Sequence, residues 1–413
     1  PAAEIVTSDA TLITAADAAA MPLRLAMSGP AAALRGFEAQ AHNRMYKAQA
    51  TSITLETGGT TSDIGLIRDG ELATGRSLDI GALAIRQRSV DIGSTAIGGG
   101  SILRVNEAGA LRVGPESAGS DPGPAAFGRG GTAPTLTDAL VILGRLPDSL
   151  AGGIDLDADA AKSIMMNIAR PLGCDITTAS EAAVATAATA IAEAIKSHAF
   201  RRGIDPAETI LMVGGGGGGQ HAAETAELAG IESALVIAGA AIISAAGCLA
   251  CYPVDATEHS LLQELTGSTY AALCAEALQT SGQLDGNAVP RCLLDIAYRG
   301  QQSPIEILFD PEHDGLSDIS ERFDRAHAIL RGHAVGKGRM VHRLRVEKPR
   351  DIPQAAGGIS AVDHTNRASL FSETGTGPKS LFSDRTSIWV PRGWNWRVLD
   401  GGDILLSQEQ RAA

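Results

Sequence analysis

Aromatic side chains are scarce in this chain of 413 residues, where Phe, Trp and Tyr together make up 3% of the sequence. Glycine, with 48 residues, and alanine are abundant instead. The interior must therefore be built by close packing of small aliphatic side chains. The length allows two or three domains and a large core.

The sequence also has no run of Lys or Arg, and its formal net charge is −13 at pH 7. This charge pattern argues against a nucleic-acid partner and against binding to an anionic membrane. The five cysteines are odd in number and irregularly spaced, which indicates reduced thiols in a cytoplasmic protein. Residues 233–252 carry no charge but are rich in Ala, Gly and Ser, so we interpret them as soluble core and not as a membrane span.

The stretch LETGGTTSDIGLI, residues 55–67, places two glycines and two threonines between two apolar runs. Apolar and polar residues alternate before Gly58, and apolar residues follow Asp63, so the sequence predicts a strand on each side of the turn. In a turn made of Gly58, Gly59, Thr60 and Thr61, bare amides and hydroxyls can approach an anion such as phosphate. An ordinary hairpin turn is the alternative that the spacing leaves open.

A second glycine cluster follows the apolar run Ile210–Val213, and a helix is expected to begin near His221. A strand, a glycine turn and a helix N-terminus in succession let a phosphate or a ribose approach the backbone. The pattern is not the dinucleotide-binding fingerprint, because no acidic residue follows at the expected distance at a strand end.

The remaining pattern predicts the domain organisation. A helix is expected at 180–202 with Ser180 as its cap, and residues 114–131 hold too much Pro and Gly for a regular element. From about residue 258 charges become denser and short strands alternate with a helix at 318–331. We therefore expect an α/β domain over residues 1–257 and a β-rich α+β module over residues 258–413.

Several segments occur together in an order that resembles the hydantoinase A/5-oxoprolinase family, which includes the nucleotide-binding subunits of acetone and acetophenone carboxylases. They are SGPAA (28–32), ETGGTTSDIGLI, VDIGSTAIGGGSI (90–102), VGPESAGSDPGPAAFGRGG (113–131), TLTDALVILGRL (135–146), GGGGGGQHAAETAELAGI (214–231) and IISAAG (242–247). The resemblance extends through YRGQ (298–301), FDRAHAILRGH (323–333) and VPRGW (390–394), so it covers nearly the whole chain.

The resemblance implies a ribonuclease H-like ATPase fold of the actin, hexokinase and Hsp70 type, with ATP and Mg²⁺ as cofactors. Residues Gly58, Gly59, Thr60 and Thr61 would then form a phosphate loop. Residues Gly215, Gly216, Gly217 and Gly218 would lie in the loop on the adenosine side. Glu56 and Asp63 would be the catalytic carboxylates and hold the metal ion, with Asp91 as a further metal ligand.

The sequence departs from the family pattern at several of these positions. Glu56 stands where the family's loop usually begins with Asp, and Gly93 stands where a potential histidine ligand occurs. Ala126 and Phe127 replace a thiol and a phenol. The family's N-terminal lobe, with its own phosphate loop, has no match in these residues. Three explanations stay open: a fragment, a lobe supplied by a partner, or an incomplete ATPase.

The activity implied by the resemblance is ATP-dependent opening of a small cyclic amide, of the hydantoin or 5-oxoproline type. A hydantoinase B-type subunit would then hydrolyse the activated ring within a hetero-oligomer. Two alternatives stay open from the residues alone: a subunit of a ketone carboxylase, and a non-catalytic partner subunit with an ATPase fold.

Overall fold

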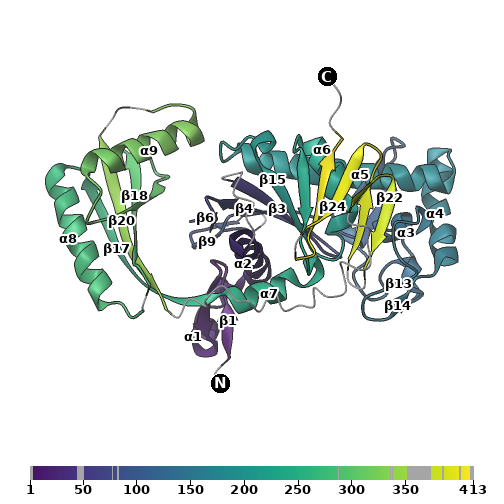
Figure 1. Cartoon of the computed structure of the whole chain (residues 1–413), viewed down its shortest axis with the longest axis horizontal. Coiled ribbons are helices and arrows are strands. Elements are labelled where there is room, and N and C mark those ends of the chain that lie inside the picture. Colours follow the sequence, from purple (N-terminus) through teal and green to yellow (C-terminus); the bar gives the residue numbers. More distant parts are fainter. Residues whose placement is uncertain are drawn as a thin grey trace.

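The computed structural model describes residues 3–43, 51–76, 78–80, 83–286, 288–334, 336, 338–350, 374–383, 386–399 and 401–409. The chain forms two α/β bodies side by side along its longest axis (Figure 1). The larger body is built on a nine-stranded sheet and the smaller one on a six-stranded sheet.

The nine-stranded sheet has the order β10-β4-β3-β15-β16-β25-β24-β21, and β5 pairs with β4 outside this row. Its strands are β3 (Thr51–Thr57), β4 (Ser62–Arg68), β5 (Glu71–Leu72), β10 (Ile92–Thr95), β15 (Ile210–Gly214), β16 (Ser233–Val236), β21 (Thr374–Thr376), β24 (Trp394–Val398) and β25 (Ile404–Gln408). Strands β3, β15 and β16 run parallel, and their neighbours at both ends of this trio are antiparallel.

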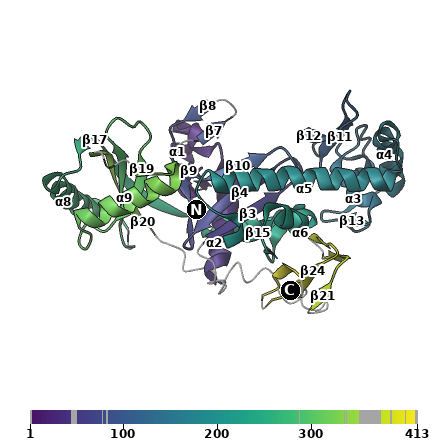
Figure 2. The same cartoon turned by 90° about the horizontal axis from the view of Figure 1, so that it is seen from above.

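Two sets of helices flank this sheet. The helices associated with it are α2 (Ser28–Asn43), α3 (Leu136–Ile142), α4 (Ala158–Leu172), α5 (Ile176–Phe200), α6 (Gly218–Ala229) and α7 (Ile243–Ala250). Figure 2 shows α5 lying along the sheet, with α2 on the other side of strands β3 and β4. Short ribbons complete this body: β6 (Thr74–Gly75) with β9 (Ser89–Val90), β7 (Leu78–Ile80) with β8 (Leu83–Ile85), β11 (Ser101–Val105) with β12 (Leu111–Ser117), β13 (Ser149–Leu150) with β14 (Ile154–Asp155), and β22 (Lys379–Phe382) with β23 (Ser387–Val390).

The six-stranded sheet has the order β1-β2-β17-β20-β18-β19. Its elements are β1 (Glu4–Val6), β2 (Thr11–Thr14), β17 (Tyr252–Glu264), β18 (Arg291–Tyr298), β19 (Ile305–Phe309), β20 (Arg339–Pro349) and the helices α1 (Ala15–Ala20), α8 (Gly267–Gln283) and α9 (Leu316–Arg331). The 13-residue strand β17 begins against the N-terminal hairpin and continues into the distal part of the module, where it pairs with β20. A separate apolar core, which includes Tyr298 and Phe323, packs between this sheet and its helices.

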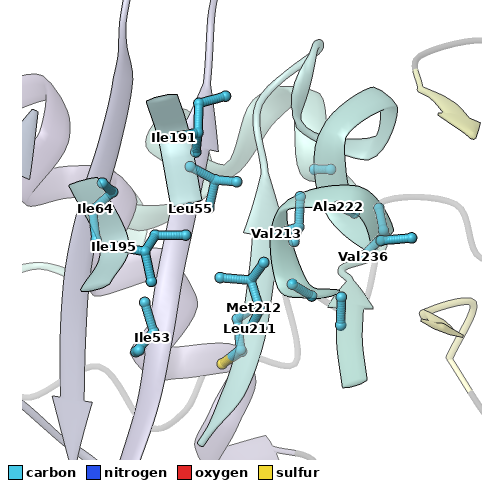
Figure 3. Close-up of a cluster of buried hydrophobic side chains, with 14 of the residues drawn as sticks. Ile53, Leu55, Ile64, Ile191, Ile195, Leu211, Met212, Val213, Ala222 and Val236 are labelled. Atoms are coloured by element: carbon cyan, nitrogen blue, oxygen red, sulfur yellow. The ribbon is translucent and has the colours of Figure 1, made fainter. Parts of the chain in front are cut away.

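The core of the larger body forms between α5 and the parallel strands. Ile53 and Leu55 on β3 alternate with polar residues, so both side chains point to the same face. Ile191 and Ile195 of α5 lie one turn apart and meet that face, together with apolar residues of β15, as Figure 3 shows. All four of these side chains are fully buried. The other residues of β3, including Thr54 and Glu56, therefore face α2.

The predicted strand-glycine-helix unit is present as β15 and α6, although α6 begins at Gly218 and not near His221. The expected cap of the long helix is wrong. Helix α5 begins at Ile176, its N-cap Asp175 accepts from the Thr178 amide, and Ser180 is buried one turn inside. The Pro- and Gly-rich stretch contains regular structure after all, because β12 extends to Ser117.

Strand pairing also departs from a single division of the chain at residue 257. Strands β17 to β20 with helices α8 and α9 build most of the smaller body, but β24 and β25 return to the larger sheet, where β25 pairs with β16. No helix within the described ranges is both long and apolar enough to cross a membrane.

Candidate functional site

The turn between β3 and β4 projects from the edge of the core, and its tip at Gly58, Gly59 and Thr60 is exposed. The Gly58 amide donates to the Thr61 carbonyl at 3.0 Å and closes the turn. Below it, the hydroxyls of Thr57 and Ser62 are 2.9 Å apart, and Ser62 also donates to the Ile97 carbonyl at 2.8 Å. These buried contacts fix the base of the turn and leave its tip open to a ligand.

A second glycine loop braces this tip from one side. The amides of Gly99 and Gly100 donate to the carbonyls of Gly58 and Gly59, at 3.1 and 2.6 Å. The two backbones approach so closely that a β-carbon on Gly98 would lie 2.6 Å from the Thr60 nitrogen. The carbonyls at the tip are thereby occupied, whereas the amides of Gly59 and Thr60 have no acceptor in the described part of the chain. Amides with this freedom are donors for an anion.

The third loop, Gly215 to Gly218, packs against the base of the same turn. The Gly217 amide donates to the Thr57 carbonyl at 3.1 Å, and Gly215 adopts a φ of +79°, which favours glycine. Helix α6 starts here with Gly217 as its N-cap, and no side chain caps it. The first amides of an uncapped helix, together with its dipole, attract negative charge. The structure thus brings the two predicted nucleotide loops together.

Glu56 and Asp63 are direct cross-strand partners at the ends of β3 and β4 that flank the turn. Both line a small cavity under α2, together with Ala33 and Phe37. Burial raises the pKa of Glu56 above its ordinary value, and the nearby Asp63 raises it further, against a hydrogen bond from Ser244. Burial also raises the pKa of Asp63, against a hydrogen bond involving Ser94.

The carboxylate pair suits a hard divalent cation. Two half-buried carboxylates side by side present oxygen donors, and within the described ranges no Lys, Arg or His forms an ion pair with either. Mg²⁺ is commonly held by one or two carboxylates with water and phosphate oxygens completing its shell. A cation at this position would also remove the repulsion between the two groups. Glu56 and Asp63 therefore fit the ion that the sequence predicts.

Ser244 is a site residue that sequence reasoning did not single out. Its hydroxyl donates to Glu56 Oε1 at 2.6 Å, from the first turn of α7. Helix α7 packs closely against α2, where Gly36 allows Ile243 to approach. The sequence does contain a hint of its role, because Ser244 lies in the segment IISAAG that contributes to the family resemblance. Nothing in the sequence, however, places Ser244 beside Glu56.

Asp91 is not brought to the carboxylate pair. It forms a two-pronged ion pair with Arg202, which follows α5. Beside it the buried ring of His198 lies against Gly93, where a β-carbon would stand 2.8 Å from Nδ1. Burial lowers the pKa of His198 to about 4, and Arg202 adds to this effect. Asp91 and His198 hold strand β10 against α5, on the face opposite the Glu56 side chain.

The sequence comparison decides which family this architecture represents. The model of the hydantoinase/oxoprolinase family matches residues 2–255. The chain belongs to this family. Both glycine loops and both carboxylates of the candidate site lie within the matched region of this hydantoinase/oxoprolinase chain.

The chain is similar to three proteins with different activities. The 5-oxoprolinase of Saccharomyces cerevisiae is 30% identical over 89% of this chain and 30% of its own length. The acetophenone carboxylase gamma subunit of Aromatoleum aromaticum is 36% identical over 47% of this chain and 27% of its own. The crystal structure of the ATP-dependent caprolactamase from Pseudomonas jessenii superimposes with a TM-score of 0.80 and 23% identity, over 98% of this chain and 65% of that one.

The structural match confirms the α/β ATPase-type fold predicted from the sequence. The chain spans less than a third of the length of these two curated relatives. Relatives of this hydantoinase/oxoprolinase chain include subunits of larger enzymes, such as the carboxylase gamma subunit.

Proposed function

We propose that this chain binds Mg·ATP and activates a small cyclic amide by phosphorylation, as one part of an ATP-dependent cyclic amidase. The observation that carries the proposal is the convergence of three features at one end of β3 and β15. These features are the braced turn at Gly58–Thr61, the uncapped N-terminus of α6, and the carboxylate pair Glu56–Asp63.

The residues of the chain have separate tasks in this mechanism. Amides of Gly59 and Thr60, with the Thr60 and Thr61 hydroxyls, donate to phosphate oxygens, and the start of α6 faces the nucleotide. Glu56 and Asp63 hold Mg²⁺, which supplies neutralisation of phosphate charge. Ser244 fixes the Glu56 carboxylate, and α2 covers the pair from solvent on one side.

The activated substrate follows from the chemistry of an amide. Resonance makes a lactam or hydantoin carbonyl a poor electrophile. Transfer of the γ-phosphoryl group breaks its bond to ADP and forms a bond to the amide oxygen, which gives an imidate-like phosphate. The task of the protein is then positioning and charge stabilisation of the transferred group. Water can attack the activated carbon, and loss of phosphate with opening of the ring yields an amino acid from a lactam and an N-carbamoyl amino acid from a hydantoin.

Hydrolysis of the activated ring falls, in this proposal, to a hydantoinase B-type subunit in a hetero-oligomer. The named subunits among the relatives support an assembly of this kind. The acetophenone carboxylase relative supports a second candidate, in which the same phosphoryl transfer activates a ketone and bicarbonate.

The test begins with calorimetric titration of Mg·ATP into the chain, alongside the variants Glu56→Gln and Gly59→Ala. A β-carbon at Gly59 meets nothing within 4 Å in the protein, so this variant should fold normally yet obstruct a phosphate. We expect a Kd in the high-micromolar range or tighter, about −5.5 kcal/mol or better, for the parent chain. Both variants should bind at least tenfold more weakly.

Phosphate release is then measured with a hydantoinase B-type subunit and 5-oxoproline, hydantoin or caprolactam. A separate assay uses acetophenone and bicarbonate in place of the cyclic amide. Release with a lactam or hydantoin alone supports the amidase, and release that requires ketone and bicarbonate identifies the carboxylase. If neither the chain nor the assembled complex binds Mg·ATP, the proposed ATPase role is wrong and the non-catalytic alternative replaces it.

A further inference from the structure

A second cavity, away from the nucleotide loops, lies between the N-terminal hairpin and the smaller body. Its volume is about 420 Å³, within the range of roughly 300–1,000 Å³ that is usual for small-molecule sites. The β1–β2 hairpin contributes Asp9 and Thr11, and the segment before α2 contributes Arg24. Residues 87 and 88 and strands β17 and β20 close the other walls.

Most charges on these walls already have partners. Arg345 pairs with Glu258 and, at 2.8 Å, with Glu347. Arg88 pairs with Glu306 of β19 at 2.5 Å, an ion pair that joins the two bodies. These neutralised pairs form a rigid polar frame, because each guanidinium is held in place by its carboxylate.

Two charged groups on the same walls are left over. Arg24 and Asp9 are each half-buried, and neither forms an ion pair within the described residues. They do not pair with each other although both line one cavity. Both groups therefore remain available to a ligand in the cavity.

Local hydrogen bonds hold the backbone segments of Arg24 and Asp9 and orient the Asp9 carboxylate. The Ser8 amide and hydroxyl both donate to the Arg24 carbonyl, at 2.7 and 2.9 Å, which fixes the two segments relative to each other. The hydroxyls of Thr7 and Thr11 donate to Asp9 Oδ1, at 2.5 and 3.1 Å. Its carboxylate is thus oriented through one oxygen, and no protein donor within the described residues reaches Oδ2.

We propose that this cavity binds a small amino acid zwitterion. The planar guanidinium of Arg24 matches a carboxylate through two parallel hydrogen bonds, and Asp9 accepts from an ammonium group. Val254 and Ala256 offer a short apolar wall for the carbon chain between the two charges. Zwitterion binding does not rest on the proposed function. That the zwitterion is the ring-opened product does rest on it, since opening a lactam by water yields one carboxylate and one amine.

The experiment is calorimetric titration of L-glutamate and 6-aminohexanoate into the full chain without nucleotide. Glutarate, which lacks the amine, and 1,5-diaminopentane, which lacks the carboxylate, serve as ligand controls. We expect at least one zwitterion to bind in the millimolar range or tighter, and both controls to bind at least tenfold more weakly. Arg24→Gln and Asp9→Asn should each weaken the zwitterion at least tenfold.

Two further variants keep the outcome interpretable. Arg104→Gln removes an exposed ion pair with Glu116 elsewhere on the surface and should bind like the parent. Gly59→Ala should lose nucleotide affinity yet retain the zwitterion, so failure of one site is distinguished from failure of the other. Circular dichroism spectra of Arg24→Gln and Asp9→Asn are compared with that of the parent chain to check that both variants are folded. Absence of binding by both zwitterions, or unchanged binding in folded Arg24→Gln and Asp9→Asn, would overturn the proposal.

Discussion

A β-carbon on Gly215 would overlap the carbonyl oxygen of Thr57. This contact joins the glycine loop before α6 to the end of β3, and it explains why the loop needs glycine at this position. Gly215 also has a positive φ, so any other residue would be strained there as well as crowded.

Gly215→Ala should therefore destabilise the chain by about 2–4 kcal/mol, from backbone strain together with steric overlap. The matched control is Gly216→Ala, since Gly216 is exposed and its β-carbon meets nothing within 4 Å. That variant should stay within about 0.5 kcal/mol of the parent. Urea unfolding measures the stability of both variants. Equal free energies of unfolding for Gly215→Ala and Gly216→Ala would contradict the close packing of Gly215 against Thr57.

Glu56→Gln should raise stability while it weakens metal binding. Burial and Asp63 raise the pKa of Glu56, so ionisation of this carboxyl group is less favourable in the folded chain than in the unfolded chain and lowers stability as pH rises. The neutral amide keeps an acceptor for Ser244 and removes the repulsion. We expect a higher midpoint of thermal unfolding without Mg²⁺, and a loss of Mn²⁺ affinity of at least tenfold.

The control for this variant is Glu193→Gln, which removes a carboxylate that is exposed and paired with Lys196 on α5. Glu193→Gln should change neither the midpoint of thermal unfolding nor the Mn²⁺ affinity appreciably. A Glu56→Gln chain that is less stable than the parent and binds Mn²⁺ as tightly would show that the carboxylate is a structural anchor.

A charged cluster helps to hold strand β23 on α6. Arg145 reaches Glu224 at 3.1 Å and lies 4.3 Å from the ring centre of Trp389, whose Nε1 donates to the same carboxylate at 3.2 Å. Glu224→Gln leaves the Arg145 charge uncompensated in a largely buried position. The free energy of unfolding should fall by about 1–3 kcal/mol.

The comparison for that prediction is Glu116→Gln, which breaks the exposed pair with Arg104 and should reduce the free energy of unfolding far less. Denaturant titrations followed by tryptophan fluorescence measure both variants. Similar losses for the two would mean that the Arg145 cluster adds nothing beyond an ordinary surface pair.

Acid should destabilise the fold through two buried histidines. Burial lowers the pKa of both His198 and His221 to about 4, below the ordinary value of 6.5. As pH falls below 6.5 the unfolded chain takes up these protons first, so stability declines until about pH 4. The slope is at most about 1.4 kcal/mol per pH unit for each histidine.

His221→Gln should flatten this decline when unfolding is measured at pH 7.5, 6.5, 5.5 and 4.5. His313→Gln is the control, because His313 is exposed and Asp310 raises its pKa, so its contribution has the opposite sign. A parent chain whose stability is constant from pH 6.5 to 4.5 would contradict the lowered pKa values.

Local patterns predicted the parts of the fold that depend on neighbouring residues. The strands on both sides of Gly58 and the β15–α6 unit follow from apolar periodicity and turn residues, and the family match confirms the resemblance. Ser180 was wrong as a cap because Asp175, five residues before it, takes that role. Periodicity alone cannot choose between two capping residues.

Long-range contacts account for what the sequence did not predict. Nothing near Trp394 or Ile404 indicates that their strands pair with each other and rejoin a sheet begun at residue 51. In the same way Arg202 forms an ion pair with Asp91, which lies 111 residues earlier in the sequence, and Ser244 donates to Glu56, which lies 188 residues earlier. The assignment of Glu56, Asp63 and the two glycine loops to a nucleotide site stays a prediction that the titrations above will decide.

The pairing of β25 with β16 has a consequence for biosynthesis. Residues 233–236 leave the ribosome long before residues 404–408, so one side of β16 lacks its partner while the intervening segment is made. An uncovered strand edge can pair with another chain. Nascent molecules of this protein are therefore most prone to aggregate in that interval, and slower translation beyond residue 349 should increase the need for chaperones.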